Sequence, residues 1–305
     1  MPNNNFDNCV SFHIDNGAFR GRLTRLDSVV NTILEKHKYP LPVSAVLAES
    51  TALAVLLASA LKYEGLFTLQ IQGNGPVSLV VIDVTSDGKV RACARFDEER
   101  LKKSQHLRKT DNQIEPAPHL LGEGFLAFTV DQGPDTELYQ GIVDLQGKTL
   151  SECALRYFRQ SEQIDTDLKL FFHTPGSEGK DWYASGIMIQ KIPEAGGKVR
   201  EGEDIAESWD EAKIFMESLK ADEVFDAALS AQDILTRLFH THNLAVTETK
   251  NYRFGCRCSR EKLRDTLATF KPEEIEAMCE NGKISATCQF CSENYVYDRG
   301  ELQKQ

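Results

Sequence analysis

Four of the eight cysteines in this 305-residue chain stand in two close pairs near its C-terminus. The pairs are Cys256-x-Cys258 and Cys288-x-x-Cys291, and 29 residues lie between them. Four thiolates arranged in this way complete the tetrahedral coordination of one zinc ion. The sequence therefore predicts a zinc site with one ion per chain, which requires residues 256–291 to fold back until the two pairs meet.

Local signals around the pairs fit this folding. Ser259 can cap a helix that runs to about Thr269, and Pro272 suits the first turn of another helix. Residues 283–286 and 295–297 suit a hairpin around the second pair. The fifth cysteine of the segment, Cys279, falls on a predicted helix over 273–280, where we expect a packed thiol that is not a ligand.

A segment of this length cannot bury a self-sufficient core, so a bound metal must supply most of its folding energy, on the order of 10–16 kcal/mol. A closed set of four ligands leaves no open coordination position, so hydrolytic zinc catalysis is not expected. Oxidation of the thiolates to disulfides would remove the ligands and the fold with them. The residues thus allow a redox switch, and they equally allow a static structural zinc site, which spacing alone favours.

The longer N-terminal part, residues 1–199, predicts a mixed α+β body with a largely antiparallel sheet and packed helices. Asp27 can cap a first helix, and residues 97–118 are polar and predicted to form a solvated loop. Turn signals at 73–76 and 86–88 separate three strands of a meander. The predicted strands are 10–14, 66–72, 77–84, 89–96, 124–130, 138–145, 167–173 and 183–192, and the predicted helices include 43–61 and 150–162.

The compartment follows from two further features. Residues 43–61 approach membrane-spanning length but contain Glu49 and several hydroxyls, which favours a buried helix. The N-terminus lacks the pattern of a signal peptide, so we expect a cytoplasmic protein that does not bind membranes. In a reducing compartment Cys9, Cys93 and Cys153 are expected to be small packing residues.

Between the two parts, residues 200–250 predict an acidic helical linker, followed by the zinc unit at 251–305. Residues 200–226 hold ten acids against three bases, in a chain whose net charge is -11. Apolar residues nevertheless recur there at helical spacing. The linker should therefore pack only marginally, because its charges repel one another. The apolar positions are Ile214, Phe215, Leu219, Val224, Phe225, Ile234, Leu235 and Leu238.

The cysteine pattern, followed by Tyr295, resembles the C-terminal signature of the redox-regulated 33 kDa chaperonins, a family of heat-shock chaperones. Three stretches of the body resemble the same family, so the likeness spans nearly the whole chain. These stretches are ALKYEGLFTLQIQGNGPVSLVVIDV, YQGIVDLQGKTLSE and RYFRQSEQI. The chain departs from the family pattern at Ser292, where a glycine is common, and a left-handed backbone there would be strained.

The resemblance implies an ATP-independent holdase, not an enzyme, that is inactive while reduced and zinc-bound. Oxidants would form two disulfides, which by motif position are Cys256–Cys258 and Cys288–Cys291. Zinc release would then unfold the switch and the linker, and the exposed surface would hold unfolding client proteins. Family members of this kind form homodimers when oxidised.

Two other functions use the same cysteines. A zinc-ribbon protein that binds nucleic acid is disfavoured, since residues 256–297 hold six bases against seven acids. A thiol oxidoreductase using Cys288 and Cys291 would normally carry a thioredoxin-like βαβ pattern, which the sequence does not suggest. An oxidoreductase turns over dithiols, whereas a holdase suppresses aggregation in proportion to its amount.

Overall fold

The computed structural model describes residues 6–106, 117–134, 136–175, 181–192 and 205–302. By its contacts the chain divides into two compact units, Met1–Phe254 and Gly255–Gln305. The predicted mixed α+β class is confirmed. The predicted boundary between body and linker, at residue 199, lies outside the described residues and stays a prediction.

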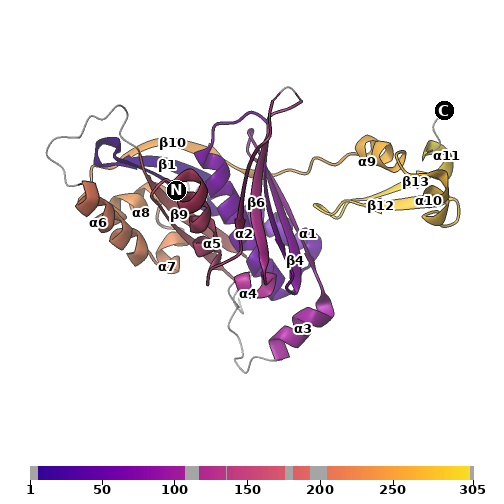
Figure 1. Ribbon diagram of the computed structural model, residues 1–305, viewed down its shortest axis with the longest axis horizontal. Helices are drawn as coiled ribbons and strands as arrows, with labels where there is room; N and C mark the ends of the chain where they lie inside the picture. Colours follow the sequence, from indigo (N-terminus) through magenta and orange to yellow (C-terminus); the bar gives the residue numbers. More distant parts are fainter. Residues whose placement is uncertain (1–5, 107–116, 135, 176–180, 193–204, 303–305) are drawn as a thin grey trace. The chain divides into compact units, whose positions relative to one another are not determined.

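Two sheets form the framework of the first unit (Figure 1). The five-stranded sheet has the order β10-β1-β2-β9-β8, and every neighbouring pair in it is antiparallel. Its strands are β1 (Asn8–Ile14), β2 (Phe19–Leu26), β8 (Thr166–His173), β9 (Tyr183–Lys191) and β10 (Ala245–Asn251). β10 lies almost wholly within residues 200–250, which were predicted to be a helical linker, but it is a strand that pairs with β1.

The six-stranded sheet has the order β11-β5-β4-β3-β6-β7. The predicted meander of three antiparallel strands is confirmed in β3, β4 and β5. The short strand β11 joins β5 in parallel, so the end of the first unit closes one edge of this sheet. The strands are β3 (Leu66–Gly73), β4 (Val77–Thr85), β5 (Lys89–Phe96), β6 (Gly124–Asp131), β7 (Tyr139–Asp144) and β11 (Arg253–Phe254).

Helix α2 (Leu41–Ala60) contacts strands of both sheets and forms the centre of the core (Figure 1). Its side chains are apolar on every face, as a helix enclosed on all sides requires. It is long and apolar enough to cross a membrane, but 83% of its most apolar stretch is buried inside the protein. The predicted buried helix is therefore confirmed. The preceding helix α1 (Ser28–His37) packs beside it.

One side chain of α2, Glu49, is an acid that lies in this apolar core. Desolvation raises the pKa of the Glu49 carboxyl from 4.5 to about 7. Because the folded state disfavours the charged form, the contribution of Glu49 to the free energy of unfolding is highest below pH 4.5 and falls until the pH passes 7. The shift corresponds to about 3 kcal/mol.

We therefore expect Glu49→Gln to raise the melting temperature at pH 8 and to leave it nearly unchanged at pH 4.5. Thermal unfolding followed by circular dichroism at both values measures this. Glu64→Gln, at an exposed position, is the matched control and should change neither value. An equal effect of Glu49→Gln at both pH values would show that its charge is not the cause.

Three helices, of which the first two are acidic, cover the face of the five-stranded sheet that points away from α2 (Figure 1). They are α6 (Ile205–Ser218), α7 (Ala221–Val224) and α8 (Ala231–Leu238). Trp209, Ala212 and Met216 form the buried face of α6, at helical spacing. The prediction for Ile214 is wrong, since it lies off this face and is 67% exposed. We call α6–α8 the helical cover.

Basic side chains of the sheet hold this cover by its backbone carbonyls. Arg25 on β2, 2% exposed, donates hydrogen bonds to Asp226 O and Leu229 O at 2.9 and 2.7 Å. Lys169 on β8 donates to Leu219 O at 3.1 Å, just beyond the end of α6. Carbonyls near a helix C-terminus are partly negative, so cations stabilise them. The cover is thus fixed to the sheet by polar as well as apolar contacts.

The predicted loop over 97–118 is wrong at both ends. The first end forms helix α3 (Glu98–His106), which carries an exposed ion pair between Lys102 and Glu98, and the second forms the buried helix α4 (Ala117–Leu121). Residues 107–116 lie outside the described part. The predicted helix over 150–162 forms as α5 (Leu150–Tyr157) and then a π-helical turn, η2 (Phe158–Glu162). A 3-10 turn, η1 (Asp15–Gly17), joins β1 to β2.

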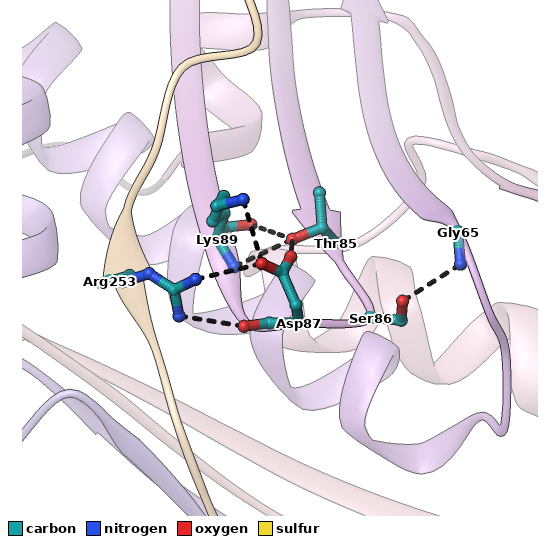
Figure 2. Close-up of polar contacts among 6 residues, drawn as sticks. All are labelled: Gly65, Thr85, Ser86, Asp87, Lys89 and Arg253. Carbon is teal, nitrogen blue, oxygen red and sulfur yellow. Dashed lines mark hydrogen bonds and ion pairs between the residues drawn. The ribbon is translucent and has the colours of Figure 1, made fainter.

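The first unit ends on a polar cluster at the turn between β4 and β5. Figure 2 shows Arg253 of β11 reaching Asp87 in this turn, with Nη1 on its carbonyl and Nη2 on its carboxylate, both at 3.0 Å. Lys89 pairs with the same carboxylate at 3.0 Å. The strand two residues before Cys256 is therefore fixed to the body.

Candidate metal centre

The second unit is built on a hairpin and three short helices. Strands β12 (Lys283–Thr287) and β13 (Asn294–Asp298) pair antiparallel, in agreement with the predicted hairpin. The helices are α9 (Arg260–Leu267), α10 (Pro272–Ala277) and α11 (Arg299–Leu302). α10 ends at Ala277, three residues earlier than the helix predicted over 273–280. Only a small core of buried side chains joins these elements, namely Leu267, Ile275, Ile284, Tyr297 and Leu302.

The turn between β12 and β13 holds the second cysteine pair. Ser292 N donates to Cys288 O at 2.9 Å, and Cys288 N donates to Glu293 O at 2.9 Å. Closing this tight turn requires a left-handed backbone at Ser292, with φ of 57°. This is the conformation that glycine adopts at this position without strain, and it costs more for serine than for glycine.

Ser292→Gly should therefore stabilise the second unit by about 1 kcal/mol. We expect metal to be retained to a higher temperature, measured by release to a coloured chelator during heating. Ser285→Gly is the matched control, because Ser285 lies in extended strand β12, where glycine weakens the backbone. If Ser292→Gly released its metal at a lower temperature than the unchanged protein, the backbone at Ser292 would not be strained.

The first cysteine pair lies in the segment that enters α9. Ser259 caps this helix as predicted, its hydroxyl accepting from Lys262 N at 3.2 Å. Arg260 anchors the helix start to the hairpin, donating to Val296 O at 2.7 Å with its guanidinium 4.5 Å from the centre of the Tyr297 ring. Cys256 and Cys258 are thereby held beside the turn of the second pair.

All four sulfurs of the predicted site come together, within 4.8 Å of one another. The Cys256 and Cys288 sulfurs are 3.7 Å apart, and the Cys258 and Cys291 sulfurs are 3.4 Å apart. Four sulfurs around one ion with bonds of 2.3 Å would be separated by about 3.8 Å. The donor set therefore fits a tetrahedral metal ion that prefers soft ligands, such as zinc or iron. Burial raises the pKa of the Cys291 thiol, so four thiolates here need a cation to neutralise them.

The remaining cysteines stand apart from this group. Cys279 packs on the small core and is not among the four clustered sulfurs. Cys9, Cys93 and Cys153 are buried in the first unit, as predicted for packing residues. Burial raises the pKa of the Cys9 and Cys153 thiols to about 11, which keeps them protonated and poorly reactive at neutral pH.

One contact of the centre was not predicted as such. The sequence predicts Tyr295 in the hairpin and in the family signature but not beside a ligand, yet its hydroxyl lies 3.4 Å from the Cys258 sulfur. Its place could be inferred from strand alternation, since Tyr295 and the buried Tyr297 lie two apart on β13 and share one face. The position of Cys258 opposite that face needed the structure.

Known proteins are similar in sequence to this chain over nearly its whole length. A family model described as Hsp33 protein matches residues 7–298. A 33 kDa chaperonin of Caulobacter vibrioides is 38% identical over 296 residues, which cover 96% of this chain and 95% of the relative. A 33 kDa chaperonin of Aliivibrio salmonicida is 36% identical over 282 residues, covering 92% and 89%.

The fold agrees with these matches. The crystal structure of a 33 kDa chaperonin from Thermotoga maritima superposes with a TM-score of 0.79 and covers 98% of this chain and 97% of its own. At 24% identity this likeness concerns the fold alone. The family model and the relatives carry the assignment, and they confirm the resemblance seen in the sequence. The chain belongs to the Hsp33 family.

Proposed function

We propose that this protein is an ATP-independent holdase chaperone that oxidation switches on. The observation that carries the proposal is a four-sulfur group in a unit with very little core of its own. Such a unit depends on its metal for folding. A stress that removes the metal therefore removes the unit's structure as well. The names of the relatives, 33 kDa chaperonins, support a chaperone function.

Zinc is the metal we propose for the reduced protein, one ion per chain, bound by Cys256, Cys258, Cys288 and Cys291. Bound zinc supplies no redox chemistry of its own, so the electrons come from the thiolates. Two molecules of peroxide accept four electrons and four protons, which yields two disulfides, four waters and the free cation. We propose the pairs Cys256–Cys258 and Cys288–Cys291, which motif position in the family implies, and all four sulfurs lie within 4.8 Å of one another.

The helical cover is the element we propose to respond. Beneath it lie apolar side chains of the five-stranded sheet, including Phe12, Phe19 and Ile187. Loss of the cover would expose them as a surface for unfolding clients. The chain connects the two units through β10 and β11, so unfolding of the second unit can loosen β11, then β10, and then α8. Self-repulsion among the acids of the cover favours its release.

The remaining expectations belong to the same proposal. The protein acts without catalysis, its partners are unfolding proteins, and it forms a homodimer when oxidised. Its net charge of -11 disfavours nucleic acid as a partner. We place it in the cytoplasm, where reduced thiols retain zinc until an oxidative stress arrives.

The test compares the reduced and the peroxide-treated protein. Elemental analysis should give one zinc per reduced chain and none after oxidation. The oxidised form should suppress aggregation of a heat-unfolded client in proportion to its amount and without ATP. Catalytic turnover of a dithiol substrate would favour an oxidoreductase instead. Chaperone action that is equal in both forms would contradict redox control.

A further inference from the structure

Tyr295 makes a direct contact with one sulfur of the metal centre. Its hydroxyl lies 3.4 Å from the Cys258 sulfur, within the range of a hydrogen bond to sulfur. The ring is held by β13, where Tyr295 pairs with Ala286 of β12. A free phenol has a pKa near 10, so at neutral pH this hydroxyl is a donor facing a thiolate acceptor.

A hydrogen bond of this kind withdraws electron density from the sulfur. Bonds to an ionised partner are roughly twice as strong as neutral ones. The thiolate attacks peroxide with its lone pair, and nucleophilicity falls as the thiolate is stabilised. The contact should therefore slow the reaction of Cys258 with oxidants. It also holds the sulfur in place and favours the thiolate over the thiol, which supports metal binding, as outer partners of ligands do.

We propose that Tyr295 sets the oxidation threshold of the centre by donating a hydrogen bond to the Cys258 thiolate. This inference rests on the proposed redox function and names a residue that regulates it. In the step concerned, the sulfur of Cys258 attacks one peroxide oxygen, the S–O bond forms, and the O–O bond breaks. Hydroxide leaves and takes a proton to become water. A second thiolate then displaces hydroxide from the sulfenic sulfur, giving a disulfide and a second water.

The variant Tyr295→Phe removes the donor and keeps the ring. We expect the second-order rate constant of peroxide-driven zinc release, followed with a coloured zinc chelator, to rise about three- to tenfold. Zinc affinity should fall about tenfold, the lower end of the usual effect of losing an outer partner. Zinc content measured first, with the hairpin amides by NMR, shows that the variant is folded and loaded.

Tyr297→Phe is the matched control. It removes a hydroxyl two residues away on the same strand, one that donates to Arg260 O at 2.8 Å. Tyr297 is fully buried, so removing its hydroxyl shows what a general loosening of the hairpin does to the peroxide reaction. We expect this variant to leave the peroxide rate constant within twofold of the unchanged protein.

A second readout identifies the sulfur. The protein is exposed briefly to a limiting amount of iodoacetamide, so that most chains are alkylated once. Peptide mass spectrometry then gives the fraction of this alkylation that falls on each cysteine. In Tyr295→Phe the share at Cys258 should rise about threefold or more relative to Cys256. Loosening of the whole unit would raise all four sites together.

The outcomes separate this inference from the proposed function. If the reduced protein holds no zinc, or if peroxide does not release it, the proposed function fails first. If zinc is bound and released but Tyr295→Phe changes neither the peroxide rate nor the share at Cys258, the role of Tyr295 is wrong. An equal acceleration in Tyr297→Phe would also overturn it.

Discussion

Cys288→Ser is expected to unfold residues 255–305 while helix α2 and the sheets packed on it stay folded. Among its described residues, 255–302, the second unit has five buried apolar side chains in its core. A structural zinc site contributes on the order of 10–16 kcal/mol to folding, far more than such a core can replace. Serine is a poor ligand for zinc, so the variant should lose the ion and with it the β12–β13 hairpin.

Hydrogen exchange measures this effect by position. In the reduced protein, hairpin amides such as Ile284 and Tyr297 should be protected, and in Cys288→Ser they should exchange within seconds. Amides of α2 should keep their protection in both proteins. Cys279→Ser is the control, since Cys279 lies outside the sulfur group, and it should retain full zinc and full protection. A protected hairpin in zinc-free Cys288→Ser would show that the unit folds without its metal.

Arg25→Met should open the helical cover without any oxidant. The Arg25 guanidinium is buried beneath the cover, and burial lowers its pKa to about 10, so it remains charged. Its two hydrogen bonds reach carbonyls between α7 and α8. The variant leaves these carbonyls without their cation, at a cost of about 2–4 kcal/mol. Because the cover already carries strong self-repulsion, this is a large share of its stability.

We expect the reduced Arg25→Met protein to bind a hydrophobic dye and to suppress aggregation in part while zinc stays bound. Faster hydrogen exchange in α8 would locate the opening. Arg22→Met is the control on the same strand, because Arg22 donates to Ser59 O and Gly21 O and not to the cover. If Arg25→Met lowers stability but α8 stays protected, Arg25 supports the sheet and not the cover.

The sequence could predict those elements in which neighbouring residues all favour the same local structure. The four cysteines, helix α2 and the β3–β5 meander carry unbroken patterns of spacing, hydrophobicity and turns. Strand β2 escaped prediction because Arg20, Arg22 and Arg25 interrupt its apolar residues. Its pairing depends on a fit across the hairpin with β1, since any side chain at Gly21 would collide with the Phe12 ring of that strand. Such a contact has no local signal.

Two further features show the same limit. Asp27 was expected to cap α1, yet the cap comes from Asp7, whose carboxylate accepts from Asp27 N and Val29 N at 2.9 and 3.0 Å. Strand β10 is polar and exposed, and only its pairing with β1 defines it. In the metal centre, the cysteine spacing predicted which sulfurs meet. The approach of Tyr295 to Cys258 depends on how α9 packs against the hairpin, which spacing does not encode.

The most direct test of the account follows Trp209, which lies in the cover, 8% exposed, with its ring 5.3 Å from that of Phe19. The only other tryptophan, Trp182, is removed by Trp182→Phe. During peroxide treatment, Trp209 emission, zinc release and aggregation suppression are recorded on the same samples. The account predicts that the emission shifts to the red as zinc leaves and as chaperone action appears. Unchanged Trp209 emission, with zinc lost and clients held, would contradict release of the cover as the switch.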